Sequence, residues 1–180
     1  MTVGSTAGEG AATPKAAMTL RALVIGIGNP DRGDDAVGVR IARLVAAERL
    51  DVRVLELDDP TEAFDAWDPA DTVVIADAIS SGGNPGDIHV VDAVARTLPA
   101  GSWAGGGTHA MGIAAVVEIA RALGRLPQRL VVVGVEAGQF DHGFPMSDAV
   151  AAAVPDAAAA VLAAIDDATY DTTDDQGGEP

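Results

Sequence analysis

The feature that most limits how this chain can fold is the passage from an apolar run into a tight turn in residues 23–39. The run Leu23–Ile27 is rich in β-branched residues, and the turn after it contains Gly28, Pro30 and Gly33. Apolar residues at helical spacing follow at once. We therefore predict a strand, a tight loop and a helix, the unit at which open α/β sheets place their sites.

The turn does not suit a nucleotide phosphate. Gly28 and Gly33 have the spacing of a phosphate-binding loop, but such a loop continues with Lys and Ser or Thr. This chain has Asp34 and Asp35 instead, and two carboxylates repel phosphate and attract a metal ion or a proton. Gly26-x-Gly28 also lacks the third glycine of a dinucleotide-binding loop.

Alternating strand and helix patterns extend this unit into an α/β fold: three layers, with a twisted, mostly parallel, five-stranded sheet between helices. One strand follows a Gly/Pro turn and is expected to return antiparallel to the strand before it, as an edge. Pro155 is expected to kink or split the last helix. The predicted strands are 21–27, 52–57, 72–77, 87–91 and 129–135, and the main helices start near Val37, Ala110 and Ser147.

Composition limits the possible functions. The chain has 180 residues, a formal net charge of −16 and no cysteine. We expect one domain at 19–168, a flexible tail at 1–18 and an acidic, disordered tail at 169–180. The negative charge disfavours nucleic acid and anionic membranes as partners. The lack of cysteine excludes a thiolate nucleophile and fits the cytoplasm, and no apolar run of about 18 residues suggests a membrane span.

Three polar residues are predicted to meet at the carboxyl edge of the sheet. Asp35 follows the first strand, Asp77 ends the strand 72–76, and His109 precedes a helix. Two carboxylates and an imidazole suit a divalent ion such as Ni, Zn, Fe or Mn, with water in the open positions. Each residue also has a structural explanation: Asp35 in a first helical turn, Asp77 in a local turn, and His109 at a helix start.

Several other polar residues follow predicted strands or lie near them. Asp58 follows the second strand and is a candidate for docking or proton transfer, and His142 lies in a loop that could line the site. His89 is expected in solvent because it alternates with apolar neighbours on an edge strand. Asp34 is predicted to cap the helix that follows it.

These residues together resemble the hydrogenase maturation proteases. The matching motifs are Gly26-Ile27-Gly28-Asn29, Gly33-Asp34-Asp35-Ala36-Val37-Gly38, Ala76-Asp77-Ala78 and Thr108-His109 before a helix. The resemblance covers roughly residues 20–162. It departs from the family at Asp35, where Glu is frequent, and at Asp58-Asp59-Pro60, where Asp-Gly-Gly is frequent.

The resemblance implies a cytoplasmic endopeptidase. It would remove the C-terminal extension of a [NiFe]-hydrogenase large-subunit precursor after nickel insertion. The family's metal-contacting positions fall on Asp35, Asp77 and His109, with nickel supplied by the substrate and other divalent metals possible in vitro. Asn29, Asp58 and His142 are possible secondary site residues, and family likeness implies a monomer.

Two mechanisms are compatible with the sequence. A bound ion could polarise a water or the scissile carbonyl while Asp35 or Asp77 acts as general base. Alternatively, the ion only positions the precursor and a carboxylate alone activates the water. A non-catalytic nickel-binding assembly factor would use the same residues. A peptidyl-tRNA hydrolase-like enzyme shares Gly26-Ile27-Gly28-Asn29-Pro30, but its Thr-Arg-His-Asn segment is missing here.

Overall fold

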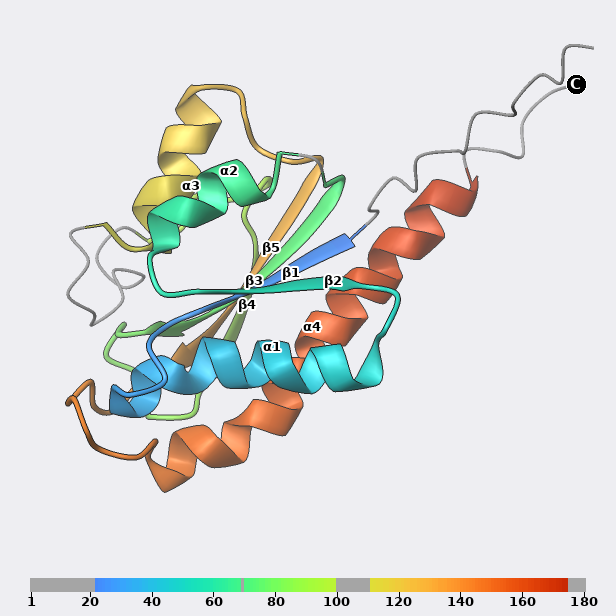
Figure 1. The fold of residues 1–180 in the computed structure, drawn as a ribbon. Helices are drawn as coiled ribbons and strands as arrows, with labels where there is room; N and C mark the ends of the chain where they lie inside the picture. The colour runs from blue at the N-terminus through green and yellow to red at the C-terminus, as the bar shows by residue number, and fades with distance from the viewer. Residues whose placement is uncertain (1–21, 69, 100–110, 175–180) are drawn as a thin grey trace, which may run out of the picture.

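The computed structural model describes residues 22–68, 70–99 and 111–174. Their centre is one five-stranded sheet with the strand order β2-β1-β3-β5-β4 (Figure 1). Four strands are parallel, and β4 is antiparallel to β5. The strands are β1 (Ala22–Ile27), β2 (Arg53–Leu57), β3 (Thr72–Ile79), β4 (Ile88–Asp92) and β5 (Arg129–Glu136).

Helices cover both faces of the sheet, as predicted (Figure 1). On one face α1 and α4 pack against each other and against the central strands, and on the other face α2 and α3 enclose a second apolar core. Alternation along the strands feeds both cores: Val73 and Ile75 of β3 face α2 and α3, and Val74 faces α1 and α4. The helices are η1 (Gly33–Ala36), α1 (Val37–Glu48), η2 (Pro60–Glu62), α2 (Ala63–Ala66), α3 (Ile113–Ala122) and α4 (Asp148–Asp174), η1 and η2 being 3₁₀ helices.

The strand β4 corrects one prediction. It is an antiparallel edge, but it pairs with β5 and not with the preceding strand β3. The parallel β3–β5 pairing occupies that side of β3 along its whole length, from Thr72–Arg129 to Ile79–Glu136. The turn 81–86 therefore carries the chain past the position of β5 before β4 begins.

The helix α4 excludes one of the two effects predicted for Pro155. Pro155 lies inside α4 and does not split it. Pro155 and Ala151, whose carbonyl loses its helical donor, are both exposed, so water can satisfy that carbonyl. The helix continues to Asp174, into the segment predicted as an acidic tail. The remaining tail residues, 1–18 and 175–180, lie outside the described residues.

The apolar character of α4 comes from its place in the core. Among the described helices, the segment Asp148–Asp167 is long and apolar enough to cross a membrane. However, Val150, Ala157, Val161 and Ile165 of this segment are buried against the sheet and α1. The structure thus explains the apolar sequence by packing within the domain.

Glycine lets α1 approach the sheet at its carboxyl edge. A Cβ on Gly38 would lie 2.2 Å from the Ile27 carbonyl oxygen and 2.3 Å from that of Ala76. A Cβ on Gly28, whose φ is +136°, would lie 1.8 Å from the Asp35 carbonyl oxygen. No side chain fits at either position, so the start of α1 rests directly on the ends of β1 and β3.

We expect Gly38→Ala to lower the free energy of unfolding by about 3 kcal/mol, because backbone oxygens on two strands would have to move. Gly82→Ala is the matched control, because a Cβ at this position would meet nothing within 4 Å. Only the positive φ of Gly82 should then lower the free energy of unfolding, by about 1 kcal/mol. Urea unfolding followed by circular dichroism measures both. Equal losses in the two variants would contradict the close-approach argument.

Candidate functional site

The loop after β1 brings Asp35 to the carboxyl edge of the sheet. The Gly28 N–H donates to the Leu57 carbonyl of β2 at 3.0 Å, which fixes the start of the loop. The Asn29 N–H then donates to Oδ2 of Asp35 at 3.0 Å, and the Asp35 N–H donates to the Arg32 carbonyl at 3.1 Å. Asn29 thus contributes to the site through its backbone, while its side-chain oxygen accepts from Asp31.

Asp35 and Asp77 lie together at the switch point of the sheet. The chain leaves β1 toward β2 on one side and returns to β3 on the other, which opens a crevice above β1 and β3. Asp77 lies inside β3 and not after it, because β3 extends to Ile79. The β1–β3 pairing nevertheless ends at Gly26–Ala76, so Asp77 is the first β3 residue beyond that ladder, and η1 packs against this end of β3.

Burial and charge together shift the ionisation of this pair. Asp35 is 7% exposed and Asp77 3%. Burial raises the pKa of Asp77 well above its usual range, and the nearby charge of Asp35 raises it further, against a hydrogen bond with the Ala78 backbone. A buried carboxyl group with a raised pKa, coupled to the charge of a second buried carboxyl group, is the arrangement expected of groups that move a proton.

Asp34, next to Asp35, has a structural role that the sequence did not reveal. We predicted that its side chain caps the helix that follows, and that prediction is wrong: neither η1 nor α1 has a side-chain cap. The fully buried carboxylate instead accepts the N–H groups of Gly138 (2.8 Å), Gln139 (3.1 Å) and Ser147 (2.6 Å), and the Ser147 hydroxyl (3.0 Å). Asp34 therefore binds the β5–α4 loop to the loop that carries Asp35.

A second buried carboxylate, Glu136, orders the loop after β3. It accepts the N–H groups of Ser81 (2.8 Å), Gly82 (2.9 Å) and Gly83 (3.1 Å), and the Ser81 hydroxyl (2.7 Å). Burial alone would raise the pKa of Glu136, but these hydrogen bonds outweigh it and lower the pKa. Sequence reasoning missed this residue. Two features of the sequence could have indicated its role: Glu136 ends an apolar strand, and a Ser-Gly-Gly turn is predicted at the same edge of the sheet.

The other predicted site residues are His109, which the structure does not describe, and Asp58 and His142, which are exposed near the carboxyl edge. His109 lies outside the described residues, and within the described ones no three acidic or histidine side chains are grouped closely enough to hold a metal ion. Asp58 follows β2 directly, at the carboxyl edge, and is exposed. His142 is exposed in the β5–α4 loop, which adjoins the Asp35 loop through the Gly143 N–H and the Asp31 carbonyl at 2.8 Å. The roles of all three remain predictions.

His89 is a further correction, because it is half-buried and not in solvent. Its Nε2 is buried without a hydrogen-bond partner. The pairing registers place Asp77, Gly134 and His89 in one row across β3, β5 and β4. Residues opposite each other share a face of the sheet, and Gly134 has no side chain to separate the two. His89 thus faces the same side of the sheet as Asp77.

Fold and site together define an α/β protein with a carboxylate-based site at the switch point of its sheet. The family model described as hydrogenase maturation protease matches residues 59–164. The Hydrogenase 2 maturation protease of Escherichia coli (strain K12) is 31% identical over 157 residues, which cover 81% of this chain and 91% of that protein. The HupD hydrogenase expression/formation protein of Bradyrhizobium diazoefficiens is also 31% identical, covering 74% and 72%.

A solved structure agrees with these sequence matches. The hydrogenase maturating endopeptidase HybD from E. coli superimposes with a TM-score of 0.66 and 27% sequence identity, over 82% of this chain and 93% of that one. The chain belongs to the hydrogenase maturation protease family. It is accordingly a hydrolase of the peptidase class, and the predicted fold and family are confirmed.

We expect Asp34→Asn to lower the free energy of unfolding by about 3 kcal/mol, because the new amide group would face N–H donors in a buried site. Ser147→Ala removes one of the four hydrogen bonds and should cost only about 1 kcal/mol. Urea unfolding measures both. An Asp34→Asn variant as stable as Ser147→Ala would show that the four contacts do not hold the two loops together.

The raised pKa of Asp77 predicts how stability depends on pH. Above about pH 4 the unfolded chain loses the Asp77 proton while the folded protein keeps it. The folded state then binds more protons, so this residue makes stability fall as pH rises. Asp77→Asn should therefore gain stability relative to wild type as the pH rises above about 4.

Thermal unfolding across this range measures the difference. Asp156→Asn, at an exposed position on α4, is the control and should follow wild type at every pH. A constant offset between Asp77→Asn and wild type, independent of pH, would contradict the shifted pKa.

Proposed function

We propose that this protease removes the C-terminal extension of a [NiFe]-hydrogenase large-subunit precursor once nickel has been inserted. The observation that carries the proposal is the buried, charge-coupled pair Asp35 and Asp77 at the switch point. The similar proteins from Escherichia coli are a hydrogenase maturation protease and a hydrogenase maturating endopeptidase, which supports the same reaction. Nickel enters this account as part of the substrate, carried by the precursor.

The chemistry of the donors supports contact with such an ion. Asp35 and Asp77 offer carboxylate oxygens, and His109, as the predicted third ligand, would add an imidazole nitrogen, a mixed set suited to nickel and other divalent metals. Two carboxylates buried side by side cannot both be charged at low cost. A cation brought by the precursor would favour their charged forms and displace the proton on Asp77. The site would thereby distinguish a nickel-loaded precursor from a nickel-free one.

Hydrolysis needs one group to accept a proton from water and one to supply a proton to the leaving nitrogen. In our account the Asp35 carboxylate, oriented by the Asn29 N–H, accepts a proton as the water oxygen bonds to the scissile carbonyl carbon. The C–N bond then breaks and the amine takes up a proton delivered through the carboxylate pair. This is an aspartic-type mechanism. Asp58 and His142 remain candidates for binding the precursor around the pair.

We further propose that the protein works as a monomer in the cytoplasm, on the large-subunit precursor. Family resemblance supports the proposal, together with a net charge of −16, which makes self-association through like-charged surfaces unfavourable. A single species with the mass of one chain in light scattering would agree with it.

The test is intact-mass analysis of a purified precursor, nickel-loaded or nickel-free, incubated with this protein. We expect loss of a C-terminal peptide from the nickel-loaded form only. Asp35→Asn and Asp77→Asn should each slow cleavage at least 100-fold, the usual scale for loss of an acid–base group, and Asp156→Asn should cleave normally.

Two outcomes would contradict the proposal. Full cleavage by Asp35→Asn and Asp77→Asn would remove the pair from the mechanism. Tight nickel binding without cleavage of any precursor would favour a non-catalytic assembly factor.

A further inference from the structure

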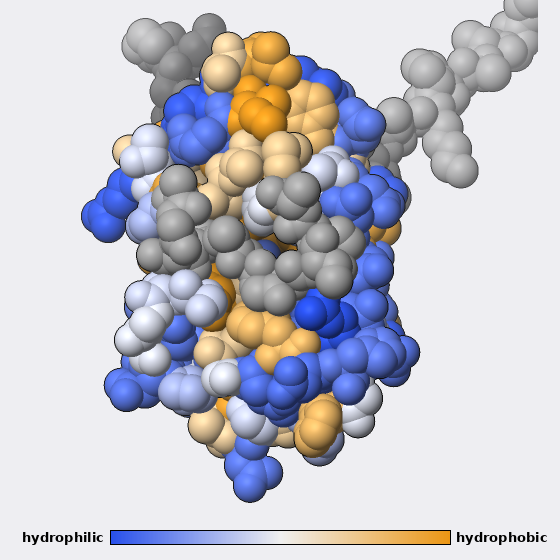
Figure 2. All heavy atoms as spheres, turned by 90° about the vertical axis from the view of Figure 1, so that its left-hand side faces the viewer, coloured by the Kyte–Doolittle hydropathy of each residue, from blue (hydrophilic) through white to orange (hydrophobic). Residues whose placement is uncertain are grey.

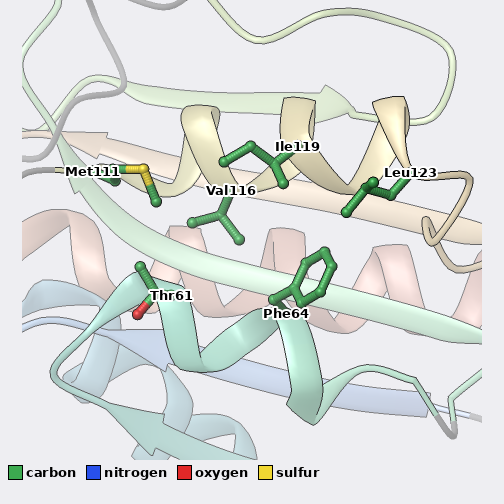
Figure 3. A pocket seen from close by; sticks show the side chains of 6 residues that line it. All are labelled: Thr61, Phe64, Met111, Val116, Ile119 and Leu123. Carbon is green, nitrogen blue, oxygen red and sulfur yellow. The ribbon is translucent and has the colours of Figure 1, made fainter.

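A groove between α2 and α3 is lined by apolar side chains and open to solvent. Val116, Ile119 and Leu123 on the α3 side point across the groove toward Thr61 and Phe64 on the α2 side (Figure 3). Met111 lies beside Thr61 at one end. The volume of the groove is about 240 Å³. We call these six residues the α2–α3 groove.

The residues on α3 show that the fold leaves this surface uncovered among the described residues. The inner side of α3 is buried in the core through Ile113, Val117 and Ala120. A second apolar row nevertheless faces outward, with Ile119 42% and Leu123 63% exposed. A helix that only covers a sheet needs one apolar face. Contiguous exposed apolar side chains beside it are typical of a binding surface.

The groove begins at the edge of the sheet where Asp35 and Asp77 lie. Thr61 lies in η2, shortly after β2 ends, and Met111 precedes α3 at its N-terminal end. Figure 2 looks onto this edge and shows apolar side chains in the upper and lower parts of the face, with hydrophilic ones on both sides of them. The ten residues of α3 are about 15 Å long, enough for four or five residues of an extended peptide.

The charges beside the groove indicate what it would bind. Glu62, Asp65 and Asp68 lie on the α2 side and are exposed. The positive charge of Arg125, which lies among them, is already paired. Its guanidinium carbon lies 4.0 Å from the centre of the Phe64 ring, and its guanidinium group forms ion pairs with Asp65 at 3.6 Å and with Asp68. The border on this side is therefore acidic, and it favours Lys or Arg next to apolar residues in a partner.

We propose that the α2–α3 groove binds an apolar, Lys- or Arg-containing segment of the hydrogenase large-subunit precursor, in extended form, while the bond to be cleaved lies at Asp35 and Asp77. This inference rests on the proposed function. It adds a second contact between the protease and the precursor, away from the bond that is cleaved. Binding energy from such a contact is expressed mainly in KM. The groove would thus select the substrate, and the carboxylate pair would cleave it.

The first test compares two double variants of the full-length protein. Ile119→Ser with Leu123→Ser alters the groove. Leu50→Ser with Val90→Ser, at exposed apolar positions on other elements, is the matched control. In steady-state cleavage of the nickel-loaded precursor, the groove variant should show a KM at least ten-fold higher with kcat unchanged, and the control should match wild type. An unchanged KM, or a loss confined to kcat, would overturn the inference.

The second test does not depend on cleavage. A photo-crosslinking amino acid replaces Ile119, and the crosslinked product is mapped by mass spectrometry after illumination with the precursor. We expect a crosslink to an apolar precursor segment that contains Lys or Arg. Crosslinks confined to this chain or to a second copy of it would show that the groove has another occupant and would overturn the inference.

The two tests separate the two proposals. If the wild-type protein leaves the precursor intact while the variant with the photo-crosslinking residue at position 119 crosslinks to it, the proposed function alone is refuted. Cleavage by the wild type with no effect of the groove variant would refute the groove alone.

Discussion

The rest of this structure depends on how closely α1 approaches the sheet. A Cβ on Gly38 would lie 2.2 Å from the Ile27 carbonyl oxygen and 2.3 Å from that of Ala76. The start of the helix therefore rests on the backbone of two strands. The preceding turn is thereby pressed against the carboxyl edge, and the four residues of η1 are all buried. Two of them are aspartates. Burial of their carboxylates is thus a consequence of backbone packing that glycine makes possible.

Neighbouring aspartates in this turn have opposite surroundings. Asp34 accepts four hydrogen bonds from the β5–α4 loop and the first residue before α4, which satisfies its charge. Asp35 faces Asp77, and the charge of one disfavours ionisation of the other. The first carboxylate holds two loops together, and the second is coupled by its charge to Asp77. Two adjacent aspartates thus lie in different electrostatic surroundings.

Much of the fold and part of the site could be predicted from the sequence. Strand and helix patterns gave the three-layer architecture because fully apolar strands and amphipathic helices have distinct periods. The placement of Asp35 and Asp77 near each other was predictable because the parallel strands that lead to them run toward the same edge of the sheet. The partner of β4 was not predictable, because a turn sequence does not say which strand already occupies the neighbouring position. The sequence left open whether Pro155 kinks or splits α4, because its effect depends on whether water reaches the freed carbonyl.

Long-range hydrogen bonds were the main features that the sequence did not reveal. Asp34 looked like a local helix cap, since its partners are more than 100 residues away along the chain. Glu136 was likewise not predicted, because its donors in the turn at Ser81 lie more than 50 residues away along the chain. The hydrogen-bond donors of a buried carboxylate depend on the tertiary structure, and they cannot be read from a single sequence.

Asp35 and Asp77 are inferred to act as one buried, charge-coupled pair. The decisive measurement is carbon-13 NMR of the aspartate carboxyl groups, titrated in the wild type and in Asp35→Asn. We expect the pKa of the Asp77 carboxyl to lie well above the usual aspartate range in the wild type and to fall when the charge at position 35 is removed. An Asp77 carboxyl that titrates in the usual aspartate range in both proteins would rule out the coupled pair.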